Sequence, residues 1–116
     1  MNSSVIKWPD QKTGHNAVSD WARKVSQEHP KIIRIGYAGS YARGDWGVGS
    51  DLDLIIFLER SERSFWQRAL DLPLPDLPVP ADMLVYTVNE WQSLAEQGAR
   101  FYKTVQRDAR WVYARD

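Results

Sequence analysis

One short apolar run limits the fold of this chain more than any other feature. Residues 52–58, Leu-Asp-Leu-Ile-Ile-Phe-Leu, are apolar at every position except Asp53. A run of this length indicates a strand, and because apolar and polar residues do not alternate in it, both of its faces should be buried. We therefore expect residues 51–59 to form a central strand of a sheet that is covered on both sides.

The rest of the chain supplies the other strands and the helices that such a sheet needs. Strands are predicted at residues 32–38, 81–88 and 110–114, and helices at residues 14–28, 61–70, 89–97 and 101–107. Ser61 and Ser40 are expected to act as N-caps, the latter of a single helical turn, and the four prolines of residues 71–80 favour an extended connection. The predicted fold class is α+β, with a small mixed sheet of about four strands backed by helices.

Length and composition allow one domain. The chain has 116 residues, of which 43% are hydrophobic and 26% charged, and this is enough for a single core. We assign residues 14–116 to that domain and residues 1–13 to an N-terminal arm. Fifteen Lys and Arg balance fifteen Asp and Glu, so the net charge gives no strong sign of direct nucleic-acid binding. Without cysteine, the chain has no disulfide, zinc ribbon or thiol nucleophile.

The apolar segments are too short for a targeting or membrane function. The N-terminus lacks the apolar core of a signal peptide, and no apolar run is long enough to span a bilayer. We expect a cytoplasmic protein without a membrane partner. The six tryptophans predict an aromatic core. Two interpretations stay open for residues 71–80 and for Trp66, Trp91, Tyr102 and Trp111, which are either a rigid linker with core aromatics or docking surfaces.

Two carboxylates stand at the head of the apolar strand. Side chains alternate along a strand, so Asp51 and Asp53 share one face, with Cα atoms about 6.6 Å apart. Carboxylates at this spacing can share a divalent cation, and oxygen ligands select Mg²⁺ or Mn²⁺. A cation would also offset the cost of placing two charges beside a buried strand. The alternative is a solvent-exposed strand end with Asp51 in a turn.

A Gly-Ser pair follows the strand predicted at residues 32–38. Gly39 has no Cβ and lets a ligand approach the backbone, and N–H groups at the start of a helical turn form an anion site suited to nucleotide phosphates. An ordinary Gly-Ser turn is the alternative. His15 and His29 are expected at the surface, so Ser40 has no catalytic histidine. The chain also lacks a P-loop and a dinucleotide-binding fingerprint.

Together these two features are more specific than either alone. The pattern Gly-Ser, ten intervening residues and Asp-x-Asp at residues 39–53 resembles the signature of the DNA polymerase β-like nucleotidyltransferase superfamily. Residues 39–54 resemble the minimal nucleotidyltransferases in particular, in which Arg43 and Ser50 are also characteristic positions. The flanking strand pattern extends the resemblance to most of residues 15–114.

The resemblance implies a reaction and a third carboxylate. The reaction is transfer of a nucleoside monophosphate, AMP from ATP, to an acceptor hydroxyl, with release of pyrophosphate. The family uses a third carboxylate on the next strand of the sheet, and Asp82 fits this position. Asp71 and Asp76 are rivals, but both belong to the proline-rich connection.

The resemblance also assigns roles to seven residues. The catalytic and metal-binding ones are Asp51, Asp53 and Asp82, which would hold two Mg²⁺ ions, with Mn²⁺ as an alternative and Asp82 also as general base. The nucleotide-binding ones are Gly39, Ser40, Arg43 and Ser50. For Arg43 a structural role stays open, in which it pairs with Asp45 or packs on Trp46 instead of neutralising a phosphate.

The same resemblance implies a protein partner, a HEPN-domain toxin. Minimal nucleotidyltransferases act as antitoxins of HEPN-domain toxins and adenylylate a toxin tyrosine, which predicts a type VII-like antitoxin. Two other functions stay open: a non-catalytic antitoxin that occludes its toxin, and an enzyme that modifies a small-molecule hydroxyl such as that of an antibiotic. A homo-oligomer is compatible with each of them.

Overall fold

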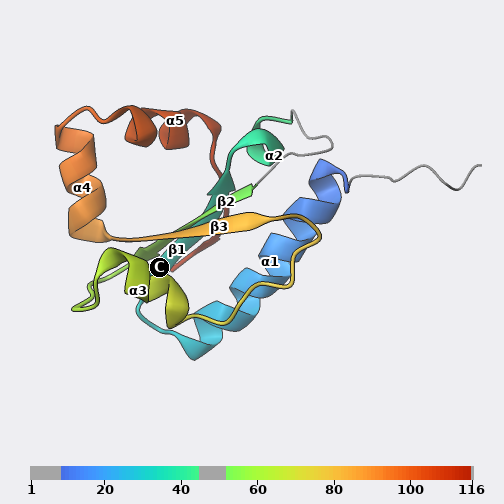
Figure 1. Cartoon of the computed structure of the whole chain (residues 1–116), viewed down its shortest axis with the longest axis horizontal. Helices are drawn as coiled ribbons and strands as arrows, with labels where there is room; N and C mark the ends of the chain where they lie inside the picture. The colour runs from blue at the N-terminus through green and yellow to red at the C-terminus, as the bar shows by residue number, and fades with distance from the viewer. Residues whose placement is uncertain (1–8, 45–51, 116) are drawn as a thin grey trace, which may run out of the picture.

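The chain folds into one mixed sheet with helices on both faces. The computed structural model describes residues 9–44 and 52–115. Its elements are α1 (Gln11–Glu28), β1 (Ile32–Ala38), α2 (Ser40–Arg43), β2 (Leu52–Leu58), α3 (Phe65–Leu70), β3 (Ala81–Thr87), α4 (Val88–Glu96), α5 (Arg100–Asp108) and β4 (Arg110–Ala114) (Figure 1). The strand order is β3-β2-β1-β4. The predicted α+β fold class, with a four-stranded mixed sheet, is confirmed.

The first helix is longer than its apolar pattern predicts. α1 begins at Gln11, three residues earlier than expected. The reason is an N-cap that the periodicity does not reveal, because the Asp10 carboxylate accepts a hydrogen bond of 2.8 Å from the Thr13 N–H. Residues 11–13, which the sequence analysis places in an N-terminal arm, are therefore helical.

Both predicted serine caps are wrong. α3 begins after Ser64 rather than after Ser61, whose hydroxyl instead accepts a hydrogen bond of 3.0 Å from the Arg63 N–H in a turn. α2 is present as predicted, but Gly39 occupies its N-cap position and Ser40 is its first helical residue. No side-chain hydrogen bond to a described residue caps α2.

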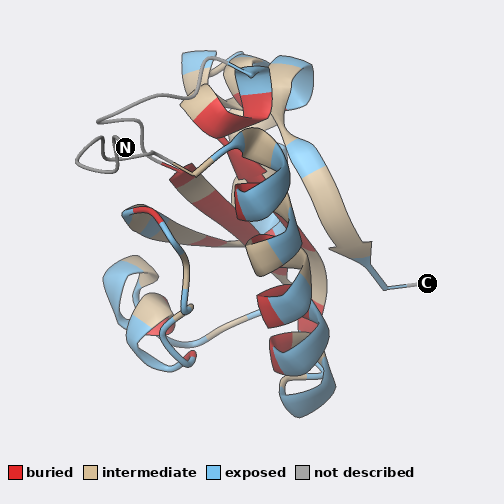
Figure 2. Ribbon diagram, turned by 90° about the vertical axis from the view of Figure 1, so that its right-hand side faces the viewer, coloured by how far each residue is buried: buried red, intermediate tan, exposed pale blue. Residues whose placement is uncertain are grey.

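β2 is one of the two interior strands of the sheet, and its two neighbours, β1 and β3, run in opposite directions. It pairs antiparallel with β1 and parallel with β3. One face of the sheet packs against the buried stripe along α1 (Figure 2). The main residues of this core are Leu52, Leu54 and Ile56 of β2 and Val18, Trp21, Ala22 and Val25 of α1. The prediction of a central strand buried on both faces is confirmed, and Asp53 lies half-buried within it.

The other face of the sheet is covered by α4 and α5, largely through aromatic rings. Ile55 and Phe57 pack there with Val105 of α5. The half-buried rings around them are Tyr86, Trp91, Phe101 and Trp111, and neighbouring rings, including Phe57, have centroid separations of 4.9 to 6.1 Å. These distances are typical of packed aromatic pairs. Trp91 and Trp111 are thus core residues, whereas Trp66 is 75% exposed.

The proline-rich connection packs against the α1 side of the protein. Leu72 and Val79 are buried in the larger core, and the Trp21 indole N–H donates a hydrogen bond of 3.2 Å to the Pro73 carbonyl. These contacts support the interpretation of residues 71–80 as a rigid linker. Leu74, which is 88% exposed, points away from that core.

A buried arginine joins α3 to β3 and α4. Arg68 is 6% exposed, and its guanidinium donates to the Val85 carbonyl at 3.1 Å and to Glu90 Oε2 at 2.9 Å, while its Nε donates to the Arg63 carbonyl at 3.0 Å. Glu90 also accepts a hydrogen bond of 2.8 Å from the Thr87 N–H, which closes a capping box at the start of α4. Arg68 first, and then Thr87, hold the pKa of the Glu90 carboxyl below its ordinary value.

We expect Arg68→Ala to lower the free energy of unfolding by about 2–3 kcal/mol. The substitution leaves the Val85 carbonyl and the Glu90 carboxylate without their partner. Arg63→Ala is a matched control, because it removes only the half-exposed Arg63–Asp71 pair and should cost less than about 1 kcal/mol. Urea denaturation measures both values, and equal losses would contradict the role of Arg68.

The same pair predicts a pH dependence. Because the pKa of Glu90 is lowered on folding, its pairing stabilises the folded state fully above the ordinary pKa of 4.5 and is lost as the pH falls through the lowered value. The stability difference between the wild type and Arg68→Ala should therefore shrink below pH 4.5.

Candidate active site

The parallel pairing of β2 and β3 brings two predicted carboxylates together. Asp53 and Asp82 are direct partners in the register of these strands. Neighbouring strands lie about 4.8 Å apart, and paired residues point to the same face. That face is the one that carries Ile55 and Leu84 under α4 and α5. Asp53 is half-buried and Asp82 is exposed. The prediction that Asp82 lies beside Asp53 is confirmed.

The two rival carboxylates lie elsewhere. Asp71 follows α3 and pairs with Arg63 at 2.8 Å, and Asp76 is exposed in the proline-rich connection. Neither residue belongs to β3, so neither is a register partner of Asp53.

The Gly-Ser turn lies at the same end of the sheet. Ala38, the last residue of β1, is the antiparallel partner of Asp53, and Gly39 follows it directly. Gly39 has φ 91° and ψ −162°, a conformation that only glycine adopts readily. This bend starts α2 at Ser40. The backbone N–H groups of the turn therefore begin at Gly39, one residue beyond the β1 residue that pairs with Asp53.

Side chains from both ends of the chain hold α2 in place. Gln11 Nε2 donates to the Tyr41 carbonyl at 2.7 Å, and Arg110 Nε donates to the Ala42 carbonyl at 2.9 Å. The last carbonyls of a helix have no partner within it, so these contacts satisfy groups that such a short helix leaves open. Tyr41 is fully buried, and its hydroxyl donates to the Pro9 carbonyl at 2.7 Å.

Gln11 and Arg110 are not among the residues that the sequence predicts for the site. They lie 30 and 68 residues from their acceptors, and no local pattern marks either of them. The accepting residues carry no sequence signal for such contacts either, because a hydrogen bond to a backbone carbonyl does not depend on the identity of the accepting residue.

Arg43, at the end of α2, lies near Asp108 at the end of α5. The hydrogen bond from Arg107 is the main cause that lowers the pKa of the Asp108 carboxyl, and the nearby Arg43 guanidinium acts in the same direction. α5 therefore ends close to α2, as Figure 1 also shows. The predicted alternatives for Arg43, Asp45 and Trp46, lie outside the described residues.

The carboxylate pair has the donor chemistry that Mg²⁺ prefers. Asp53 and Asp82 offer hard oxygen ligands, and Mg²⁺ in proteins commonly takes one or two carboxylates together with waters and substrate phosphates. Within residues 9–44 and 52–115, no three Asp, Glu, His or Cys side chains gather into a metal site. Asp51 and Ser50, the other predicted site residues, lie outside these ranges. The described pair thus fits a cation that takes further ligands from other groups.

His15 is half-buried rather than at the surface as predicted. Its Nδ1 lies 2.9 Å from the Tyr37 hydroxyl, and the two rings meet edge to face. Tyr37 belongs to the core on the α1 side of the sheet, whereas the carboxylate pair lies on the other side. His15 therefore contributes to packing and hydrogen bonding on the α1 side through Tyr37.

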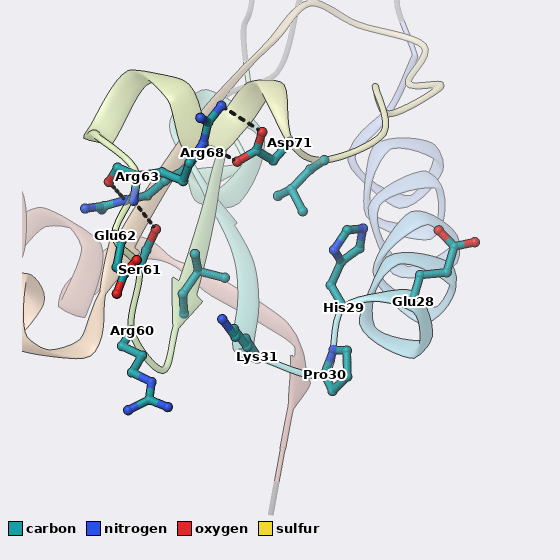
Figure 3. A pocket seen from close by; sticks show the side chains of 12 residues that line it. Glu28, His29, Pro30, Lys31, Arg60, Ser61, Glu62, Arg63, Arg68 and Asp71 are labelled. Atoms are coloured by element: carbon teal, nitrogen blue, oxygen red, sulfur yellow. Dashed lines mark hydrogen bonds and ion pairs between the residues drawn. The ribbon is translucent and has the colours of Figure 1, made fainter.

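A cleft of about 940 Å³ lies at the other end of the sheet (Figure 3). It lies beside Leu58, five residues along β2 from Asp53, or about 17 Å. Two of its cations are already paired, Arg63 with Asp71 and Arg68 with Glu90. The other charges that line it, Lys31 and Arg60 against Glu28 and Glu62, are of mixed sign. The cleft therefore has no electrostatic preference for an anion or a cation.

Comparison with known families identifies the class of protein. Residues 18–110 match the nucleotidyltransferase domain, so the chain belongs to that family. Among solved structures it is similar to a protein from Sulfolobus solfataricus that is provisionally described as a nucleotidyltransferase. That match has 17% identity and a TM-score of 0.61 and covers 90% of this chain and 84% of the other, which shows a shared fold. A search of curated proteins found no match.

These comparisons confirm the resemblance at the level of the nucleotidyltransferase domain. The minimal subgroup and the toxin partner stay predictions. Among the helices that the structure describes, none combines the length and the apolar character needed to cross a bilayer.

If the carboxylate pair binds a divalent cation, Mg²⁺ should stabilise the folded protein. A ligand at ten times its Kd adds about 1.4 kcal/mol. We expect Mg²⁺ to raise the Tm of the wild type in a thermal melt and to leave Asp53→Asn and Asp82→Asn unchanged. Asp76→Asn is the matched control, and it should respond to Mg²⁺ like the wild type. An equal response of all four proteins would count against this site.

Gly39 should tolerate alanine less well than Gly44. Gly39 combines φ 91° with ψ −162°, a region almost closed to other residues, so Gly39→Ala should cost about 1–3 kcal/mol. Gly44 has φ 85° and ψ 8°, the left-handed helical region, and no atom of the described residues would lie within 4 Å of a Cβ added there, so Gly44→Ala should cost about 1 kcal/mol. Urea denaturation of the two variants checks the order, and a larger loss at Gly44 would contradict it.

Proposed function

We propose that this chain is a Mg²⁺-dependent nucleotidyltransferase that transfers AMP from ATP to a protein hydroxyl. The acceptor in this proposal is a tyrosine of a cytoplasmic HEPN-domain toxin, which makes the chain a type VII-like antitoxin. The observation that supports catalysis is the register pairing of Asp53 with Asp82 beside the Gly39–Ser40 turn, in a chain of the nucleotidyltransferase domain family. The toxin partner rests on the resemblance of residues 39–54 to the minimal nucleotidyltransferases.

In the proposed reaction, one residue acts on the acceptor hydroxyl and the others bind the phosphates of ATP. The acceptor oxygen attacks the α-phosphorus of ATP, the bond from that phosphorus to the oxygen bridging to the β-phosphate breaks, and pyrophosphate leaves. Asp82 is exposed and takes the proton of the hydroxyl as general base. Gly39 and Ser40 bind the β- and γ-phosphates through backbone N–H groups, and Arg43 neutralises phosphate charge.

The carboxylates would also hold the metal. Asp53 and Asp82, with Asp51, are the residues proposed to bind Mg²⁺. When bound there, Mg²⁺ would lower the pKa of the acceptor hydroxyl and would stabilise the charge of the leaving pyrophosphate. Asp53 is half-buried at the head of β2, beside the exposed Asp82, so the pair can be reached by a metal ion from solvent.

The proposal is tested by label transfer from [α-³²P]ATP with Mg²⁺, with the product of the neighbouring gene as acceptor. We expect label on the partner. Asp82→Asn should reduce the transfer rate by about 100-fold or more, because a general base contributes at least that much. Asp76→Asn, an exposed aspartate outside the site, is the matched control and should transfer label normally.

The remaining outcomes separate the other candidate functions. If no label reaches the partner although the complex is stable, and if the double variant Asp51→Ala, Asp53→Ala still neutralises the toxin, the chain acts by occlusion. If the purified protein labels a small molecule without a partner, it is a small-molecule nucleotidyltransferase. Either result would overturn protein adenylylation.

A further inference from the structure

The balanced net charge of this chain conceals a strong separation of charge. Between residues 97 and 115 the chain has five cations and only one anion. Since the whole chain has fifteen of each, the rest has ten cations and fourteen anions. α5 and β4 are therefore strongly basic, and the remainder of the protein is acidic. A local field of this kind steers and orients charged partners even when the total charge is zero.

The cations of α5 lie along one side of the helix. Arg100, Lys103 and Arg107 follow the spacing i, i+3, i+7, which places them on one face, and all three are exposed. We call these three residues the basic face of α5. The opposite side of the helix packs into the protein through Phe101 and Val105. Helix packing therefore fixes the direction in which the basic face points.

The basic face is largely uncompensated. Arg107 pairs with Asp108 through a bond of 2.9 Å. Arg100 and Lys103 form no ion pair with any residue that the structure describes. An anionic partner would therefore gain new ion pairs with Arg100 and Lys103.

The basic face also leads to the candidate active site. α5 lies on the side of the sheet that carries Asp53 and Asp82, and its last turn lies beside α2 (Figure 1). Arg110, the first residue of β4 and two residues beyond the end of α5, donates a hydrogen bond to the Ala42 carbonyl of α2. A partner that contacts α5 therefore reaches toward the residues that would carry out the transfer.

We propose that the basic face of α5 docks an acidic segment of the protein acceptor next to its reactive hydroxyl. This inference rests on the proposed function, because it assumes that the acceptor is a protein. It commits to an acidic polypeptide because of charge complementarity, and it adds a specificity element outside the residues that act on ATP.

A single-stranded nucleic acid fits the same surface less well. Proteins that bind single strands combine a basic groove with aromatic rings on which bases stack. The rings of α5 are already engaged in packing, Phe101 against Trp91 and Tyr86, and Tyr102 against Trp91. Basic side chains without free stacking platforms favour acidic side chains as partners.

Two random copolymers test the inference without knowledge of the natural acceptor. Fluorescent poly(Glu,Tyr) is an acidic polypeptide with tyrosine hydroxyls, and poly(Lys,Tyr) is its basic counterpart. We expect fluorescence anisotropy to show binding of poly(Glu,Tyr) but not of poly(Lys,Tyr).

Two variants of α5 and one control test which residues bind the acidic copolymer. The double variant Arg100→Glu, Lys103→Glu should weaken the binding of poly(Glu,Tyr) by about tenfold or more. The variant Lys24→Glu, Lys31→Glu is the matched control, with the same charge change at exposed positions away from α5. Arg100→Gln, Lys103→Gln gives a milder second variant.

The outcomes separate docking from catalysis. Equal binding of the two copolymers, or equal binding by the wild type and the α5 variants, would overturn the inference. Displacement of poly(Glu,Tyr) by a single-stranded RNA that binds more tightly would overturn it in favour of nucleic acid. Label transfer from ATP to poly(Glu,Tyr) is measured in parallel. Binding that depends on α5 but leads to no transfer would leave the docking surface standing and count against the proposed function.

Discussion

The candidate site depends on the parallel pairing of β2 with β3. This pairing sets Asp82 directly beside Asp53, and a shift of one residue would turn Asp82 to the opposite face of the sheet. A parallel pair requires a long crossover, which here contains α3 and the proline-rich segment. Arg68 ties α3 to β3 and α4, and Leu72 and Val79 anchor the proline-rich segment in the core. The crossover therefore fixes the position of a carboxylate as well as linking two strands.

The second constraint is the anchoring of α2 by both ends of the domain. A helix of four residues has little stability of its own. Gln11 at the start of α1 and Arg110 at the start of β4 supply hydrogen bonds to its carbonyls, and the buried Tyr41 fixes it from within. The Gly-Ser turn is thus positioned by residues that are remote in the sequence. This arrangement holds the Gly39–Ser40 turn, for which we propose phosphate binding, in a defined orientation.

Charge is distributed so that the two sides of the candidate site differ in sign. Asp53 and Asp82 form its acidic part, and α5 and β4 form the basic part beside α2. An acidic centre suits a metal ion, and a basic surround suits the anions that must approach it. The total charge, which is zero, shows nothing of this separation.

The sequence by itself determined the elements whose signals are local. The apolar run of residues 52–58 predicted a central strand. The Gly-Ser and Asp-x-Asp spacing pointed to Gly39 and Asp53, which the structure places at the same end of the sheet. Tertiary structure alone decided the direction of β3, the contacts of Gln11 and Arg110 with α2, and the burial of His15 against Tyr37. The physical reason is that periodicity and turn chemistry act over a few residues. Strand direction and long-range hydrogen bonds depend on which distant segments share one core.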